Sequence, residues 1–201
     1  MKKLKIALTG GIGSGKSELS KILITKKYIV LDADKIAKEI LYNDADVRKK
    51  VIQKFGDDSY SEHTPNIKYL AENVFKNHAR VKQINKIIHP PTTKIIERRM
   101  NEALIENDLV FVESALIFEA GLEDLFDFTI LVTADDEARI KRVVKRENIT
   151  EEEVLERMDH QLPQKEKKGL ADFIIDNNST LIELENKANF VLSIINSISA
   201  Q

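Results

Sequence analysis

Residues 5–17 have the sequence KIALTGGIGSGKS, which is the strongest indication of the fold in this chain. The apolar run at 6–8 predicts a short buried strand, and the residues from Gly10 to Ser17 match the pattern G-x-x-x-x-G-K-[ST]. Glycines lack a Cβ, so the backbone of such a loop can adopt positive φ and bring its N–H groups close to an anion. A helix follows, from about Ser14 to Thr25, and its positive N-terminal end also favours phosphate.

The side chains of this loop indicate a nucleoside triphosphate as the ligand. Lys16 is expected to reach the β- and γ-phosphates, and the Ser17 hydroxyl to ligate Mg²⁺. A glycine-rich turn without any ligand is the alternative, and the strand–loop–helix context argues against it. We therefore expect ATP and Mg²⁺ here, with the nucleotide held by Gly11, Ile12, Gly13, Ser14, Gly15, Lys16, Ser17 and Glu18.

The composition describes a globular chain with enough apolar material for a packed core. Of 201 residues, 42% are hydrophobic and 32% are charged, which suits one domain or one domain with insertions. A formal net charge of −2 and 6% aromatic residues argue against a nucleic-acid-binding protein. There is no cysteine, which excludes disulfides, thiolate zinc sites and a cysteine nucleophile.

The N-terminal residues lead directly into the first predicted strand, without the apolar stretch of a signal peptide. No segment has the length of a membrane span. We therefore expect a cytoplasmic protein whose partners are small molecules and neither membrane nor nucleic acid. The sequence shows no heptad pattern, which favours a monomer but does not establish the oligomeric state.

Two carboxylates follow the second predicted strand. Residues 28–31 form a short apolar run that ends in Asp32-Ala33-Asp34. In open α/β sheets ligands bind at the carboxyl ends of the strands, so Asp32 and Asp34 are candidates for chemistry beside the phosphate loop. Either residue can instead cap the helix that starts near Lys35, and the sequence leaves both roles open.

The chain between the second and third strands is predicted to be helical. Apolar residues recur at helical spacing from about 33 to 107, with a loop-like stretch at 56–66 and no clear strand. Two parallel strands need a crossover of only about a dozen residues, so we expect an inserted helical subdomain that covers a substrate. His89 precedes Pro90-Pro91, which are expected to interrupt two helices. Its side chain either contacts a ligand or forms a structural corner.

Three further apolar runs complete the predicted sheet, at 109–112, 129–132 and 173–175. Strands that alternate with helices indicate a parallel sheet covered on both faces, so we predict an α/β fold of the P-loop NTPase type with five parallel strands. Glu113, after the third strand, is a candidate to reach Mg²⁺ through water. A final helix at about 181–198 closes the fold. The nucleotide core then comprises about 1–32, 108–133 and 171–201 of a single domain.

The segment at about 134–170 is rich in basic residues. Arg139, Arg142 and Arg146 share one helix face at the spacing i, i+3 and i+7. Thr150 and Glu153 form a capping-box pattern that opens the next helix. The remaining polar residues of interest in this segment are Arg157, Gln161, Lys165, Lys167 and Lys168.

A solvated basic face is the ordinary explanation for such a run of charges. Phosphoryl transfer, however, needs guanidinium groups to hold charge on the equatorial oxygens of the transferred group. Because a phosphate loop lies upstream, we expect a mobile helical lid over 134–170, with Arg142 and Arg146 contacting ATP.

The set of motifs favours a kinase over other nucleotide-binding proteins. A GTPase would show Asn-Lys-x-Asp and Asp-x-x-Gly, but residues 186–189 lack the aspartate and the second motif is absent. Adenylate-kinase-like enzymes typically have Gly-Thr after the loop lysine, where this chain has Ser17-Glu18. A carboxylate after the second strand indicates a hydroxyl acceptor, since an anionic acceptor would need arginines there. Another P-loop kinase of a nucleotide or metabolite is one alternative, and a nucleotide-binding module without turnover is the other.

Several motifs, in order along the chain, resemble the dephospho-coenzyme A kinase family. The similarity runs from the first strand to about Asn178, and the combination of motifs at these separations is more specific than the phosphate loop alone. The matching residues are LTGGIGSGKS at 8–17, Asp32-Ala33-Asp34, Asn85 with His89-Pro90, Leu116-Ile117-Phe118-Glu119, Arg142 with Arg146, Arg157 with Gln161, and the run from Ala171 to Asn177.

The resemblance implies ATP-dependent phosphorylation of the ribose 3′-hydroxyl of dephospho-coenzyme A, the last step of coenzyme A synthesis. It also implies a nucleotide core, a helical domain and a lid. On the matching positions Asp34 is the candidate general base, and Asp32 is the alternative or a partner on the Mg²⁺ side. Lys16 and Arg142 would stabilise the transferred charge. The residues that would bind the acceptor or place the substrates are Asp34, His89, Arg157 and Gln161.

The sequence departs from the family pattern at two places outside the phosphate loop. Ala115 stands where the family usually has a proline, which would loosen the turn after the third strand. The family often has an arginine near the position of Ile67, and a substrate contact through that arginine is not expected here.

Overall fold

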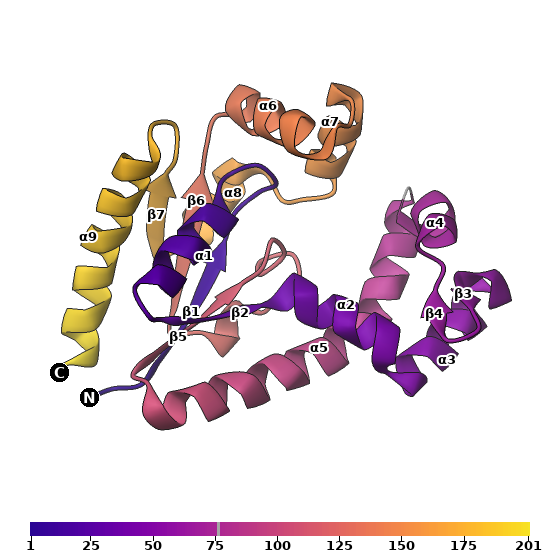
Figure 1. Ribbon diagram of the computed structural model, residues 1–201, viewed down its shortest axis with the longest axis horizontal. Helices are drawn as coiled ribbons and strands as arrows, with labels where there is room; N and C mark the ends of the chain where they lie inside the picture. Colours follow the sequence, from indigo (N-terminus) through magenta and orange to yellow (C-terminus); the bar gives the residue numbers. More distant parts are fainter. Residues whose placement is uncertain (76) are drawn as a thin grey trace. The chain divides into compact units, whose positions relative to one another are not determined.

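The computed structural model describes residues 1–75 and 77–201. The chain forms two compact units, one made of Met1–Asp32 with Arg99–Gln201 and the other of Ala33–Arg98 (Figure 1). The first unit holds a sheet covered by helices, and the second is mostly helical. Among the described residues, none of the helices combines the length and the hydropathy of a membrane span.

The first unit is built on a five-stranded parallel sheet, which confirms the predicted fold class. The strand order is β2-β5-β1-β6-β7, so the strand that leads into the phosphate loop lies in the middle of the sheet (Figure 1). In its register Leu8 of β1 lies opposite Glu113 on one side and Ile130 on the other. The strands are β1 (Leu4–Thr9), β2 (Ile29–Asp32), β5 (Leu109–Glu113), β6 (Phe128–Thr133) and β7 (Phe173–Asp176).

The side chains of β1 alternate between two cores, one on each face of the sheet. Ile6 and Leu8 join a cluster with residues of the first and last helices, whereas Ala7 packs with Ile117 and Phe118 on the other face. Because both faces of β1 are buried, its residues 6–8 are all apolar and do not alternate with polar residues. The helical elements of this unit are α1 (Lys16–Thr25), η3 (Glu123–Leu125), α6 (Asp136–Glu147), α7 (Glu151–Asp159), α8 (Gln164–Leu170) and α9 (Leu181–Ser199), together with the end of α5 (His78–Glu106).

Two helix starts in this unit follow from local chemistry. α1 begins at Lys16, slightly later than the predicted start near Ser14, because Gly15 has a φ of 102° in the left-handed region and ends the loop there. The capping box predicted for α7 is confirmed. The Thr150 side chain accepts from the Glu153 N–H, and the Glu153 carboxylate accepts from the Thr150 N–H.

The second unit is helical with one small hairpin. The prediction of a strandless loop at 56–66 was wrong in part, because Tyr60–Ser61 (β3) and Thr64–Pro65 (β4) pair as antiparallel strands. Strands of two residues show no apolar alternation, so periodicity could not indicate them. The remaining elements are α2 (Ala33–Asn43), α3 (Ala45–Phe55), the 3₁₀ turn η1 (Asp57–Ser59), α4 (Ile67–Leu70), the π-helical turn η2 (Ala71–Phe75) and the first part of α5.

α5 runs unbroken through Pro90 and Pro91, so the predicted interruption after His89 was wrong. The two prolines remove backbone donors from the helix, but a buried stripe with a spacing of four residues continues on both sides of them. Thr92 follows the two prolines in this stripe, and its Oγ1 donates to the Ile88 carbonyl one turn earlier at 2.7 Å. The stripe consists of Ile84, Ile88, Thr92, Ile96, Met100 and Leu104.

Candidate active site

The phosphate loop joins the end of β1 to the start of α1 and is held from a distant part of the chain. The Ser14 N–H donates to the Gly11 carbonyl at 3.1 Å, which closes the loop on itself. Asn177, directly after β7, donates from Nδ2 to the Ser14 carbonyl at 2.8 Å. A Cβ at Gly15 would lie 2.1 Å from that nitrogen, so packing as well as the positive φ requires glycine there.

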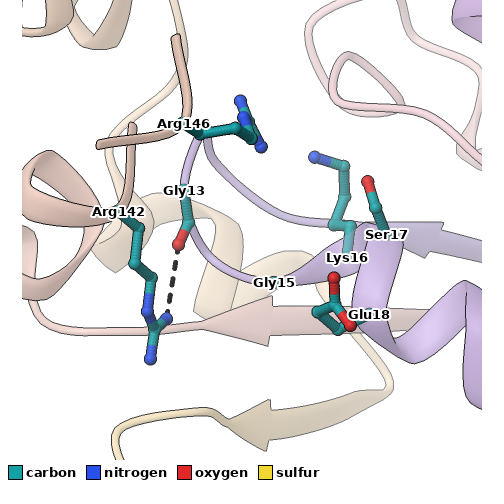
Figure 2. A pocket seen from close by; sticks show the side chains of 7 residues that line it. All are labelled: Gly13, Gly15, Lys16, Ser17, Glu18, Arg142 and Arg146. Carbon is teal, nitrogen blue, oxygen red and sulfur yellow. Dashed lines mark hydrogen bonds between the residues drawn. The ribbon is translucent and has the colours of Figure 1, made fainter. Parts of the chain in front are cut away.

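A cavity of about 300 Å³ opens beside the loop and the first turn of α1 (Figure 2). Its walls combine two distant parts of the chain that were both predicted to bind nucleotide, the loop and the arginine face of α6. Backbone N–H groups, a lysine and two arginines around one cavity suit a polyphosphate. The lining residues are Gly13, Gly15, Lys16, Ser17, Glu18, Arg142 and Arg146.

The two arginines of this cavity differ in how firmly they are held. Arg142 is half-buried, and its Nη1 donates to the Gly13 carbonyl at 3.3 Å (dashed in Figure 2) while its Nη2 donates to the Asn177 carbonyl at 2.9 Å. Arg146 is exposed, and its guanidinium donates to the neighbouring Glu147. The Arg142 guanidinium is therefore fixed at the cavity wall by two carbonyls, whereas Arg146 keeps a side-chain partner at the surface.

Arg157, which the resemblance assigns to substrate placement, also pairs with Glu147. Hydrogen bonding from Arg146, followed by the hydrogen bond and charge of Arg157, lowers the pKa of Glu147 against the opposing effect of its partial burial. Glu147 therefore stays ionised, and its pair with Arg157 joins α6 to α7, while Arg146 is its neighbour on α6. A phosphate that binds Arg146 or Arg157 would compete with this carboxylate.

Ser17, the predicted Mg²⁺ ligand, lies beside Glu113 at the carboxyl end of β5. Its Oγ donates to Glu113 Oε1 at 3.0 Å, and Ser20 Oγ donates to Oε2 of the same carboxylate at 2.6 Å. Asp32, at the end of the neighbouring β2, is the register partner of Glu113. The Glu113 carboxylate thus lies beside the first turn after the loop, and its contact with Mg²⁺ through water stays a prediction.

These oxygen donors fit Mg²⁺, which proteins commonly hold through one or two carboxylates together with substrate phosphates and water. A hydroxyl next to a carboxylate at the loop provides such a partial set of ligands. Among the residues that the structure describes, no group of three or more acidic or histidine side chains could hold a metal by itself. A magnesium ion here would therefore depend on the nucleotide for its remaining ligands.

Asp34 and His89 belong to the unit Ala33–Arg98. Asp34 lies in the first turn of α2, two residues after Asp32, and both carboxylates are exposed. His89 is half-buried in α5, and burial lowers the pKa of its imidazole, which keeps the ring neutral near pH 7. The roles of all three residues toward a substrate stay predictions.

Arg139 and Asn177 contact the loop, although the sequence did not indicate them as site residues. Gln161, a predicted substrate-binding residue, contacts the loop backbone. Arg139 is 4% exposed, and its Nε donates to the Ile12 carbonyl at 2.9 Å. Gln161, predicted to bind substrate, accepts from the Ile12 N–H through Oε1 at 2.9 Å. Helical periodicity could not distinguish Arg139 from its neighbours on α6. Asn177 did have a positional signal, because it directly follows a strand at the carboxyl edge of the sheet.

The chain is similar to known proteins over nearly its whole length. Residues 4–183 match the family model described as dephospho-CoA kinase. The chain belongs to the dephospho-CoA kinase family. A dephospho-CoA kinase of Salinibacter ruber is 38% identical over 185 residues, which cover 91% of this chain and 93% of the relative.

Solved structures agree with the family assignment. A crystal structure of a Thermus thermophilus protein has a TM-score of 0.81 at 31% identity, covering 96% of this chain and 98% of the other. A dephospho-CoA kinase from Campylobacter jejuni has a TM-score of 0.71 at 30% identity, covering 95% and 96%. The kinase family and the P-loop fold predicted from the motifs are therefore confirmed, and the loop cavity described above is that of a dephospho-CoA kinase family member.

Proposed function

We propose that this chain transfers the γ-phosphoryl group of ATP to the ribose 3′-hydroxyl of dephospho-coenzyme A, which yields coenzyme A and ADP. The observation that carries the proposal is the cavity that gathers the phosphate loop, Lys16, Arg142 and Arg146 in a member of this kinase family. The names of its relatives identify the acceptor.

The residues around the cavity provide charge stabilisation for the transfer. Negative charge on the equatorial oxygens of the γ-phosphoryl group has to be stabilised in the transition state. Cations that are already in position stabilise it without any cost of reorganisation during the reaction. Lys16 lies on the loop, and two carbonyls already orient Arg142. When bound, Mg²⁺ would neutralise charge on the β- and γ-phosphates, and Ser17 with Glu113 and Asp32 are the residues that would hold it.

The acceptor hydroxyl needs a base and a fixed orientation. We assign the base to Asp34, whose carboxylate takes the proton of the 3′-hydroxyl as that oxygen attacks the γ-phosphorus. The bond from phosphorus to the β,γ-bridging oxygen breaks, and ADP leaves with the bonding electrons. Asp32 is the alternative base, and we expect the neutral His89 and Arg157 to help place the substrates.

A coupled assay that reads ADP release tests the reaction. Purified protein with Mg·ATP would be offered dephospho-coenzyme A, AMP, shikimate, gluconate and pantothenate in parallel. We expect turnover with dephospho-coenzyme A alone and a product phosphorylated at the 3′ position. Turnover on another acceptor would keep the kinase activity and overturn the assigned substrate.

The matched variants Asp34→Asn and Asp32→Asn separate the two candidate bases. Loss of a general base typically costs about 10²–10⁴-fold in rate, so Asp34→Asn is expected to lower kcat by that order with ATP affinity unchanged. Asp32→Asn is expected to raise the Mg²⁺ concentration needed for half-maximal rate. If the kcat loss followed Asp32→Asn instead, the assignment of the base would pass to Asp32.

A further inference from the structure

Ile12, in the middle of the phosphate loop, has both of its backbone polar groups bound by side chains from distant elements. Its N–H donates to Gln161 Oε1 at 2.9 Å, and its carbonyl accepts from Arg139 Nε at 2.9 Å. Gln161 follows α7, and Arg139 lies on α6. Neither contact is local, since the partners are separated from Ile12 by 149 and 127 positions in the chain.

Arg139 is packed too closely against the loop to act as a free cation. Only 4% of it is exposed, and its Nη1 pairs with Asp136 at 2.7 Å. A Cβ at Gly11 would lie 2.3 Å from Arg139 Nη2, and a Cβ at Gly13 would lie 2.5 Å from the Arg139 carbonyl oxygen. These two glycines are therefore required by the close approach of α6, in addition to any need of a bound phosphate.

Gln161 is held in place by a buried ion pair behind it. The next residue, Leu162, donates its N–H to Glu119 Oε1 at 2.9 Å. Glu119 pairs with Lys167 at 2.6 Å, and the Lys167 side chain is fully buried. A buried charge is costly unless its partner is fixed, so this pair is a rigid anchor for the turn that carries Gln161.

We propose that Arg139 and Gln161 are positioning residues that hold the phosphate loop, through Ile12, in the conformation that binds the nucleotide. Glu119 and Lys167 act one step further away, by anchoring the turn between α7 and α8. Without the two contacts the loop backbone would gain conformational freedom, and binding a triphosphate would have to order it again. The proposal deepens the proposed kinase function, but it concerns ATP binding and not the identity of the acceptor.

The test is isothermal titration of the nonhydrolysable analogue AMP-PNP with Mg²⁺ into the wild type, Gln161→Met and Gln53→Met, without any acceptor. Gln53 is an exposed glutamine of α3, so the same substitution there controls for the change of side chain. Gln161→Met keeps the length of the side chain and removes the acceptor oxygen. We expect it to bind about five- to tenfold more weakly, the loss of one hydrogen bond, while Gln53→Met binds like the wild type.

Steady-state kinetics distinguish a positioning role from general damage or from a substrate contact. For Gln161→Met we expect a higher KM for ATP, an unchanged KM for dephospho-coenzyme A and an unfolding midpoint without ligand that falls by no more than about 4 °C, the loss of one hydrogen bond. Wild-type affinity for AMP-PNP would overturn the proposal. So would a raised KM for the acceptor alone, because Gln161 would then bind the acceptor as the sequence predicted.

A second variant, Arg139→Met, tests the other contact with Ile12. Because both side chains act on one residue, the double variant should lose less affinity than the product of the two single losses. Independent, multiplicative losses would overturn the shared role. If Arg139→Met does not fold, the titration of Gln161→Met still tests whether these contacts with Ile12 support nucleotide binding. If the wild type fails to phosphorylate dephospho-coenzyme A, the proposed function fails, while the AMP-PNP titration still tests the loop contacts.

Discussion

The phosphate loop and the α6–α7 region meet at one cavity, but they contribute to it in different ways. The loop between Gly10 and Ser17 offers mainly backbone groups, and its glycines let other elements approach closely. The α6 helix offers three arginine side chains from one face, and each has different partners. Arg139 is buried against the loop, Arg142 is held by two carbonyls and Arg146 is exposed.

Equal spacing on a helix therefore does not give equal roles. Three arginines can share a face and still divide into one that shapes the site, one that lines it under restraint and one that pairs at the surface. What decides is the distance from the loop backbone and the burial of each guanidinium, because a buried cation needs fixed partners whereas an exposed one is solvated. The following changes test this division, and each has a different expected size.

Lys16→Met tests whether the loop acts by its backbone alone. The lysine lines the cavity, and removal of a cation that stabilises the transferred charge is expected to lower kcat about a thousandfold, close to 4 kcal/mol. The coupled assay measures kcat at saturating ATP. Lys141→Met on α6 is the matched control, since that side chain is 73% exposed and pairs with Glu137. A loss below tenfold for Lys16→Met would show that the backbone N–H groups and the arginines of the cavity supply most of the stabilisation.

Lys167→Met tests the anchor behind the α7–α8 turn. The substitution leaves Glu119 mostly buried without its cation, so the free energy of unfolding is expected to fall by about 3 kcal/mol. Urea unfolding measures the loss. Adding Glu119→Gln removes the uncompensated charge and should recover part of the stability. If the double variant were less stable than Lys167→Met, the ion pair would not be the source of the cost.

The fold could be predicted from the sequence because its signals are local. Apolar runs followed by Gly10, Asp32 or Glu113 mark strands that end at one sheet edge, and the pattern around Lys16 and Ser17 contains the geometry of its own loop. The continuous α5 could not be predicted, since the local effect of Pro90-Pro91 opposes a buried stripe that only tertiary packing stabilises.

The candidate site could be predicted only in part, for a related reason. The sequence predicts that Arg142 and Arg146 contact the nucleotide, and both line the cavity with the loop. The contacts of Arg139 and Gln161 with Ile12 join positions more than a hundred residues apart, and no spacing within α6 or α7 encodes them. The roles of Asp34 as the base and of His89 in placing the substrates remain predictions from the resemblance.

Arg142→Met and Arg146→Met compare the restrained arginine with the exposed one. Because two carbonyls hold the Arg142 guanidinium at the cavity wall, its loss should lower kcat/KM about thirtyfold, near 2 kcal/mol. Arg146 has to leave Glu147 before it can bind phosphate, so we expect a loss of about threefold. The coupled assay at low ATP measures both. Equal losses would contradict a division of roles by restraint.

Thr150→Ala and Thr180→Ala are expected to change stability least among these variants. They also test whether the start of α7 helps to position Gln161. Each threonine caps a helix by accepting a backbone N–H, at the start of α7 and of α9, so each loss should cost about 1 kcal/mol in unfolding free energy. Neither variant should change the affinity for AMP-PNP, because Glu119 and Lys167 hold the far end of the α7 segment. If Thr150→Ala alone weakened that affinity, the whole of α7 would position Gln161, and the restraint on the loop would extend to the start of that helix.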